Sequence, residues 1–486
     1  MAAISTSPEV ASVSQGVPLK SLPPLVPAAF IPWVCREAIA PQLRREGDAG
    51  APTALWTESN GSEGCYGGWE LRVPAGEPAG EDLTVEVLAS GSGLGRGTDE
   101  LTADAFWHNS GGAELDWEPL LQDAAEGTTG DSGPGLHGLP DLIEQSLDVR
   151  LVARLRRPPA GVEIRLRFGL RWSARGVVRW HGWRVARALP RPPRMLRLGV
   201  ASGRPAQWNG PEGNAAHYVQ QCRLAGEAGV DLVCLPETVL TWGTPKMSPE
   251  DLLAMAVPLS PEPGPWLDQF RDVARAYRMG ICFSVYERAG DRGEVVYNTA
   301  LLLGREGELI GTYRKVHLAI AEARRGVAAG HTFPVHTFDG VRVGMAICMD
   351  SAASEAPRIL AQGGAEVLLM PIMNDFRATP WGHHRGAFHA ERWRLIQRAH
   401  AFDNHLYVVA AKNVTTGSAI IAPWGDVLAW NDGDRDVIWA GVNVDDRPKH
   451  NLGSSVQAVL ASMRRPATYS ALTSTAAPAG PPSLRP

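Results

Sequence analysis

One proline-rich run divides this sequence into two parts with different residue patterns. Residues 188–195 read Ala-Leu-Pro-Arg-Pro-Pro-Arg-Met. Prolines at that density prevent a helix and stiffen the chain as an extended spacer. The chain has 486 residues, which is too many for one ordinary hydrophobic core. We therefore predict two folded units, with residues 189–194 as the linker between them.

The part before the linker carries the pattern of antiparallel strands. Over residues 162–172, apolar side chains at every second position alternate with Glu and Arg, and a Ser-Ala-Arg-Gly turn follows. A period of two is typical of a strand with one buried face, and several such runs predict a β-sandwich. We place this mainly antiparallel, jelly-roll-like accessory domain at 33–188, with a Gly-rich, acidic loop region at 90–141. Residues 1–32 are rich in Pro, Ser and Ala, which predicts a disordered segment.

The part after the linker alternates between strand and helix patterns. Short, almost wholly apolar runs of the kind buried on both faces of a sheet are separated by segments with apolar residues at helical spacing. Such alternation predicts a layered α/β domain, which we place at 195–470. Residues 471–486 are rich in Pro, Ala and Ser, which predicts a disordered tail. The runs expected as strands are 196–200, 230–235, 281–285, 341–347, 366–372 and 406–410.

Composition argues against several classes of protein. A formal net charge of −5 is mild for a chain of this length and argues against a nucleic-acid binder, which usually carries a basic excess. No run approaches the ~20 consecutive apolar residues of a membrane span, and the N-terminus lacks the pattern of a secretory signal. The six cysteines form no CxxC pair, which argues against a disulfide scaffold or a structural zinc site. We therefore expect a cytoplasmic protein with no nucleic-acid partner, no membrane partner and no metal.

Three segments of the second part share one construction, in which an expected buried strand ends in a reactive side chain. The three reactive side chains are Glu237, Lys315 and Cys348. Groups at the carboxyl ends of strands in an α/β sheet converge in the crevice there. We therefore expect these three side chains to meet in one site.

A carboxylate, an ammonium and a thiol together suit acyl transfer through a thioester. A free thiol has a pKa near ~8.5, so little of it is thiolate at neutral pH. A carboxylate beside the thiol can take its proton during attack and return that proton to the leaving amine. The ammonium can stabilise the tetrahedral oxyanion, together with the backbone N–H that follows the nucleophile, here that of Met349. These residues therefore predict a thiol hydrolase.

The same segments resemble the motifs of a known family. Leu-Pro-Glu-Thr at 235–238, Tyr-Arg-Lys-Val-His at 313–317 and Gly-Met-Ala-Ile-Cys-Met-Asp at 344–350 look like the catalytic motifs of the nitrilase superfamily of carbon–nitrogen hydrolases, in that family's order. The resemblance covers residues 195–469. Supporting matches are Tyr-Asn-Thr-Ala at 297–300, Arg-Ala-His-Ala-Phe-Asp-Asn at 398–404, Gly-Ser-Ala-Ile-Ile-Ala-Pro-Trp-Gly at 417–425 and Arg-Arg-Pro at 464–466.

By this resemblance Glu237 is the general base and acid, Lys315 stabilises the intermediate and Cys348 is the nucleophile. Many members carry a second glutamate seven residues after the lysine, and Glu322 stands at that offset. The resemblance assigns Glu322 to position the lysine or the substrate, while an exposed charged turn at 321–325 is the alternative. The family fold is an α-β-β-α sandwich that usually forms a homodimer or a higher homo-oligomer, and it needs no metal or organic cofactor.

The residues around the nucleophile narrow the expected substrate. The nitrile-cleaving branch usually has Cys-Trp-Glu, whereas this chain has Cys-Met-Asp at 348–350. The resemblance therefore favours a small-molecule amide or N-carbamoyl substrate over a nitrile. The segment after Pro371 lines the pocket in relatives and offers candidate substrate-binding residues. Together with Met349, these candidates are Asn374, Asp375 and Phe376.

Other functions remain open on the same residues. Nitrile hydrolysis, or transfer of the acyl group to an amine, could use the same triad. A catalytically silent binding or scaffold protein could keep the fold, although an intact set of Glu237, Lys315 and Cys348 argues against it. Taken alone, Lys315 could be a solvated hairpin lysine. Asp350 is expected to be a structural hydrogen-bonding partner.

The first part bears a weaker resemblance to the galactose-binding-like jelly-roll modules that are attached to many hydrolases. Gly-Gly-Trp-Glu-Leu-Arg-Val at 67–73 and the tryptophan-containing strands of 172–183 carry this likeness. The tryptophans could form a ligand-binding face or pack in the core, and core packing is the commoner fate of aromatic residues in strands.

Overall fold

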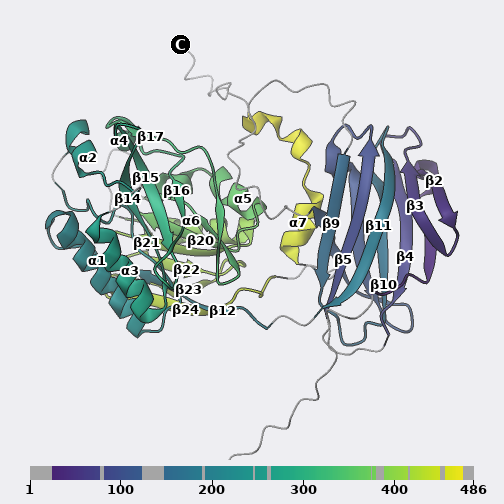
Figure 1. Cartoon of the computed structure of the whole chain (residues 1–486), viewed down its shortest axis with the longest axis horizontal. Coiled ribbons are helices and arrows are strands. Elements are labelled where there is room, and N and C mark those ends of the chain that lie inside the picture. The colour runs from purple at the N-terminus through teal and green to yellow at the C-terminus, as the bar shows by residue number, and fades with distance from the viewer. Residues whose placement is uncertain are drawn as a thin grey trace, which may run out of the picture. The chain divides into compact units, whose positions relative to one another are not determined.

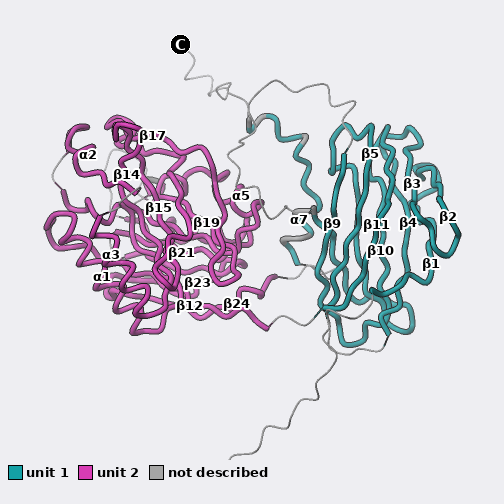
Figure 2. Tube along the Cα trace, viewed as in Figure 1, with its two compact units in different colours: residues 1–131, 136–191, 449–486 teal, residues 132–135, 192–448 magenta. Residues whose placement is uncertain are grey.

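The structure is a computed structural model in which the chain forms two compact units (Figure 2). Unit 1 comprises residues 1–131, 136–191 and 449–486, and unit 2 comprises residues 132–135 and 192–448. Residues up to 470 were assigned from the sequence to the hydrolase domain, whereas residues 449–486 group with unit 1. The residues that the structure describes are 24–76, 82–122, 147–188, 192–244, 247–259, 264–373, 375–378, 388–413, 416–448 and 455–473.

Unit 1 consists of two antiparallel sheets (Figure 1). The first has the order β1-β4-β10-β6-β7, and the second has the order β2-β3-β11-β5-β9-β8. The strands of the first sheet are β1 (Ala29–Val34), β4 (Tyr66–Pro74), β10 (Glu163–Arg171), β6 (Leu101–His108) and β7 (Glu114–Pro119). Those of the second are β2 (Gln42–Asp48), β3 (Ala51–Glu58), β11 (Val177–Ala188), β5 (Asp82–Ser92), β9 (Leu147–Leu155) and β8 (Leu121–Gln122). The helix α7 (Val456–Met463) also belongs to this unit.

The two sheets of unit 1 enclose one apolar core. Trp69 and Trp107 of the first sheet and Trp180 and Val85 of the second belong to the same buried cluster. Each of these tryptophans is at most 3% exposed, so they pack in the core and do not form a ligand-binding face. The mainly antiparallel sheets predicted for this domain are confirmed, whereas its jelly-roll-like architecture and its likeness to galactose-binding-like modules stay predictions.

Two sequence-based expectations for unit 1 are wrong in part. The loop expected at 90–141 contains β6, β7 and β8, because Leu101, Ala103, Ala105 and Trp107 alternate inward and fill the core. The disorder expected at 1–32 does not extend to residues 29–32, which belong to β1 and pair with β4. Residues 123–146, 1–23 and 474–486 lie outside the described part of the chain.

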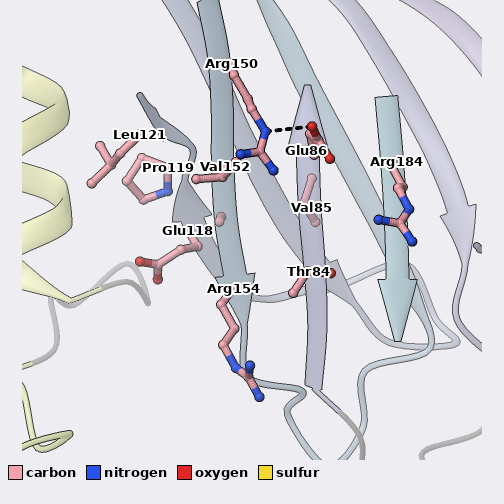
Figure 3. Close-up of a pocket in the computed structure, with 11 residues that line it drawn as sticks. Thr84, Val85, Glu86, Glu118, Pro119, Leu121, Arg150, Val152, Arg154 and Arg184 are labelled. Atoms are coloured by element: carbon pink, nitrogen blue, oxygen red, sulfur yellow. Dashed lines mark hydrogen bonds and ion pairs between the residues drawn. The ribbon is translucent and has the colours of Figure 1, made fainter. Parts of the chain in front are cut away.

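A pocket of about 570 Å³ lies on the face of the second sheet of unit 1 (Figure 3). Arg150 and Arg154 of β9 and Arg184 of β11 line it. Arg150 donates to Glu86 over 2.7 Å, and Arg154 donates to Asp82 over 3.1 Å. Arg150 and Arg154 are thus engaged in ion pairs at a sheet surface, where such pairs typically contribute little, about 0–1 kcal/mol each.

Unit 2 also contains two sheets, each with parallel strands at its centre. The first has the order β16-β15-β14-β13-β12-β24, with β17 beside β15, and the second has the order β18-β19-β20-β21-β22-β23. The strands of the first are β16 (Leu309–Arg314), β15 (Val295–Leu303), β14 (Gly280–Ala289), β13 (Leu232–Cys234), β12 (Met195–Ala201), β24 (Val437–Asn443) and β17 (Val327–Ala328). Those of the second are β18 (Val335–Phe338), β19 (Val341–Met345), β20 (Val367–Ile372), β21 (Tyr407–Lys412), β22 (Ala419–Ile421) and β23 (Val427–Trp430).

The layers of unit 2 follow from its buried clusters. One cluster joins inward side chains of both sheets, such as Leu232 with Leu369, so the sheets pack face to face. A second cluster joins the outer face of the first sheet to helices α1 (Gly210–Glu227) and α3 (Pro265–Tyr277). A third joins the outer face of the second sheet to α6 (Ala390–Asn404) and α5 (Glu355–Gln362) (Figure 1). The α-β-β-α fold class is therefore confirmed.

The sequence pattern accounts for these elements. Each strand predicted in unit 2 corresponds to an observed strand, and β13 and β20 are buried along their whole length. Helix α3 begins with Pro265 in its first turn, where a missing N–H costs nothing. It ends at Arg278, which adopts a left-handed conformation with φ of 50°. Two shorter helices, α2 (Pro249–Met255) and α4 (Ile320–Ala323), lie between strands.

Candidate active site

The strand directions of unit 2 bring the ends of β13, β16 and β19 together. Glu237 follows β13, Lys315 directly follows β16, and Cys348 follows β19 as the first residue of the 3₁₀ turn η5 (Cys348–Ala352). Strand β13 is parallel to β14, and β16 is separated from β14 by two antiparallel pairings. Strands β13 and β16 therefore run in the same direction, so Glu237 and Lys315 lie at the same edge of their sheet.

Lys315 joins two carboxylates in the interior of unit 2. Its Nζ lies 2.8 Å from Oε1 of Glu237 and 2.7 Å from Oε2 of Glu322. The side chain of Lys315 is 1% exposed, and those of the two glutamates are 4% and 5% exposed. This burial excludes the solvated lysine and the exposed charged turn that the sequence left open.

Asn298, a residue of β15, holds both carboxylates in place. Its Nδ2 donates to Oε1 of Glu237 over 2.8 Å and to Oε1 of Glu322 over 2.7 Å. Asn298 lies in the Tyr-Asn-Thr-Ala match, which indicates the family but not the role of this side chain. The backbone N–H of Met373 donates to the other oxygen of Glu237 over 3.1 Å. Both oxygens of the Glu237 carboxylate are therefore oriented by hydrogen bonds.

The charged side chains of this group shift one another's pKa values. Burial raises the pKa of the Glu237 carboxyl, while Lys315 and a hydrogen bond from Cys348 lower it in part and Glu322 raises it further. Burial alone would lower the pKa of the Lys315 amine. Glu237, Cys348 and Glu322 outweigh burial, so the pKa of Lys315 is raised and its amine stays charged. A permanently charged ammonium therefore lies beside a carboxyl that can exchange a proton.

Cys348 has an unusual backbone conformation. Its φ is 44°, and the φ of Thr238, directly after Glu237, is 53°. Left-handed conformations of non-glycine residues cost about 1–3 kcal/mol and persist only where the surrounding structure imposes them. The turns that present the thiol and the carboxylate are thus both strained, and the thiol is half-buried.

Asp350 fixes the turn of Cys348 against the segment that carries Lys315. Its carboxylate accepts from Tyr313 Oη over 2.7 Å, from the N–H of His317 over 3.0 Å and from the N–H of Ile347 over 2.8 Å. A hydrogen bond to Asp350 also raises the pKa of the His317 imidazole. Asp350 is a structural hydrogen-bonding partner, as expected from the sequence.

Of the four residues predicted to bind substrate, only Met349 and Asp375 have side chains that the structure describes. Met349 is half-buried within η5. Asp375 is 4% exposed, and its carboxylate accepts from Arg377 Nε over 3.0 Å and from Ser351 Oγ over 3.3 Å. Asn374 lies outside the described residues, as does the side chain of Phe376. Their role in substrate binding stays a prediction.

The described residues were also compared with what a metal site and a membrane-spanning helix require. Among the described residues, no three His, Cys, Asp or Glu side chains are grouped so as to hold a metal ion. Within the same residues, every helix is too short or too polar to cross a membrane.

The chain is similar to known proteins over part of its length. A family model described as carbon-nitrogen hydrolase matches residues 199–447. The chain is 31% identical over 192 residues to a probable nitrilase of Schizosaccharomyces pombe, covering 38% of this chain and 66% of that protein. It is 29% identical over 280 residues to the chloroplastic omega-amidase of Arabidopsis thaliana, covering 54% of this chain and 72% of that protein. The crystal structure of an amidase from Nesterenkonia sp. is 19% identical with a TM-score of 0.45, covering 58% of this chain and 98% of that one.

Proposed function

The chain belongs to the carbon-nitrogen hydrolase family, and from this premise we propose that it hydrolyses a small amide or N-carbamoyl compound through a thioester on Cys348. The observation that supports this proposal is the buried group in which Lys315 contacts both Glu237 and Glu322 while Cys348 hydrogen-bonds Glu237. This group offers a nucleophile, a proton carrier and a fixed positive charge in one place.

The first half of the reaction forms the thioester. Glu237 takes the thiol proton as Sγ of Cys348 attacks the carbonyl carbon of the substrate. The charge that develops on the carbonyl oxygen is stabilised by Lys315, which is already charged and fixed by two carboxylates. Glu237 then returns its proton to the nitrogen, the carbon–nitrogen bond breaks and ammonia or an amine leaves.

The second half of the reaction releases the acid. Glu237 takes a proton from water as the water oxygen attacks the thioester carbonyl. The carbon–sulfur bond breaks, the proton returns to Cys348, and a carboxylic acid leaves. Glu322 and Asn298 act as positioning residues, because they hold Lys315 and Glu237 in the geometry that both halves require.

Two observations favour an amide over a nitrile. Residues 349 and 350 are Met and Asp, where the nitrile-cleaving branch usually has Trp and Glu. The relative from Arabidopsis thaliana is named as an omega-amidase. Transfer of the acyl group to an amine and a catalytically silent scaffold are the rival functions on the same residues.

We expect the purified protein to release ammonia from amides or N-carbamoyl compounds and to leave nitriles unchanged. The measurement is ammonia release across matched amides, N-carbamoyl compounds and nitriles, with and without an added amine acceptor. Hydrolysis of nitriles alone would contradict the amide preference. An acyl-amine product in place of a free acid would favour the transferase, and a lack of reaction with every compound would favour the silent scaffold.

We also infer that the protein forms a homodimer through helices α5 and α6. These helices expose Ile359, Leu395 and Phe402, which are apolar and 47% to 68% exposed. Contiguous exposed apolar side chains mark interaction surfaces, and we propose that these three belong to one such surface. A cytoplasmic location stays a prediction.

Replacing Leu395 with Glu should convert the dimer to a monomer, because the interface would then have to bury a charge. The measurement is molar mass by light scattering at micromolar protein. Leu460→Glu, at an exposed apolar position of α7, is the matched control and should leave the mass unchanged. A wild-type monomer, or equal effects of both substitutions, would argue against this interface.

A further inference from the structure

A pocket of about 580 Å³ adjoins the proposed catalytic group. Three of its lining residues are direct neighbours or partners of that group. Thr238 follows Glu237, Ala321 precedes Glu322, and the N–H of Met373 donates to the Glu237 carboxylate. Small-molecule sites have volumes of about 300–1,000 Å³, so this pocket has room for a small substrate beside the proposed catalytic group.

Arg325 is the one charged side chain among the described residues that line this pocket. Its backbone N–H donates to the carbonyl of Glu322 over 2.9 Å, and its Nε donates to the carbonyl of Ala321 over 2.9 Å. These two bonds fix the guanidinium against the turn that also carries Glu322. Within the described part of the chain, no carboxylate forms an ion pair with Arg325, so both of its Nη groups are available to a ligand.

The neutral side chains of the pocket lie within the electrostatic reach of the same charges. Tyr286 lines the pocket and is 6% exposed. Burial raises the pKa of its phenol, Glu322 and Glu237 raise it further, and Arg325 and Lys315 lower it. Tyr286 and Arg325 both line this pocket, so the guanidinium belongs to the wall of the proposed substrate site.

The formal charges of the site explain why a guanidinium there would favour an anionic substrate. With both carboxylates ionised, Glu237, Glu322 and Lys315 together carry a charge of −1, which would repel an anionic substrate. Arg325 brings the sum to zero and supplies a planar donor pair that matches a carboxylate. A neutral substrate would gain less from such a group, because it lacks the charge-assisted pair of hydrogen bonds that a carboxylate forms.

We propose that Arg325 binds a carboxylate on the substrate, so that the enzyme prefers amides that carry a carboxylate away from the scissile bond. This inference rests on the proposed amide hydrolysis and names the substrate class of that site. It makes Arg325 a specificity-determining residue that holds the substrate and takes no part in proton transfer.

The test compares succinamate with butanamide, which has a methyl group in place of the carboxylate. The wild type should prefer succinamate. Arg325→Gln should raise KM for succinamate and lower its kcat/KM by about 10- to 100-fold, because a hydrogen bond to a charged group is lost. The kcat/KM for butanamide should change by less than about threefold, since neutral substrates make no use of the charge. Arg325→Lys should recover part of the preference, because it keeps the charge and loses the paired donors.

Arg324→Gln is the matched control, since Arg324 precedes Arg325, is exposed and is absent from the pocket lining. It should leave both substrates unaffected. Equal losses on succinamate and butanamide in Arg325→Gln would mean that Arg325 supports the fold of the site, which would overturn the inference. A wild type that hydrolyses butanamide as well as succinamate would overturn it too, while leaving the proposed function standing. A wild type that releases ammonia from no amide would overturn both.

Discussion

Replacing Cys348 with Ala should lower kcat/KM for ammonia release by at least about 10⁴-fold, because removal of a catalytic nucleophile leaves only binding and electrostatic stabilisation. The side chain is half-buried and small, so its loss should shift the melting temperature by no more than a few degrees. The measurements are steady-state ammonia release and thermal unfolding of the same preparations. A folded variant with substantial residual activity would contradict the thioester mechanism.

A covalent readout separates this mechanism from simple loss of binding. Acid quenching of the wild type during turnover should trap an acyl adduct detectable by intact mass, and Cys348→Ala should show none. Cys35→Ala is the control, because Cys35 is an exposed cysteine of unit 1. It should keep both the activity and the adduct. An adduct that persists without Cys348 would assign the nucleophile to another residue.

Several parts of the site could be predicted because they depend on residue order along single strands. An apolar run followed by a reactive side chain fixes that side chain to a strand end, and parallel strands bring their ends to one edge. This reasoning places Glu237, Lys315 and Cys348, and the structure brings all three into one buried group with Glu322. The fold of unit 2 could be predicted for a related reason, because central strands such as β13 and β20 are apolar along their whole length.

Other parts could not be predicted, because they depend on contacts between distant segments. Asn298 lies within β15 and within a recognised family match, but the local sequence does not show that it contacts two glutamates 61 and 24 residues away. Arg325 is one of two adjacent arginines, and only the fold distinguishes the one that lines the pocket. The Gly-rich, acidic composition of residues 90–141 predicts a loop, whereas β6, β7 and β8 lie there. The alternation of buried side chains from Leu101 to Trp107 is the local pattern that indicates the first of these strands.

Replacing Glu237 with Gln should lower kcat/KM by about 10³- to 10⁴-fold, the upper range for general acid–base catalysis. Gln keeps an oxygen that can accept from Lys315 and Asn298, but it cannot carry a proton between Cys348, the leaving amine and water. The pH profile should change as well. Burial raises the pKa of Glu237 above its ordinary value of 4.5, so wild-type kcat/KM should fall with decreasing pH through a point above 4.5. That acidic limb should be absent from the variant.

Glu287→Gln provides the matched control for the loss of a buried carboxylate. Glu287 is 6% exposed and accepts from Thr299 over 2.6 Å and from Arg314 over 2.7 Å, without contacting Lys315 or Cys348 in any described hydrogen bond. Its loss should lower the melting temperature, because a buried charged hydrogen-bond partner is removed, while the acidic limb stays in place. If Glu287→Gln lost as much activity as Glu237→Gln, the effect would reflect a disrupted polar interior. Both variants replace a buried carboxylate with a neutral amide of the same shape. If only Glu237→Gln lost activity and the acidic limb of the pH profile, the loss would be explained by proton transfer through Glu237.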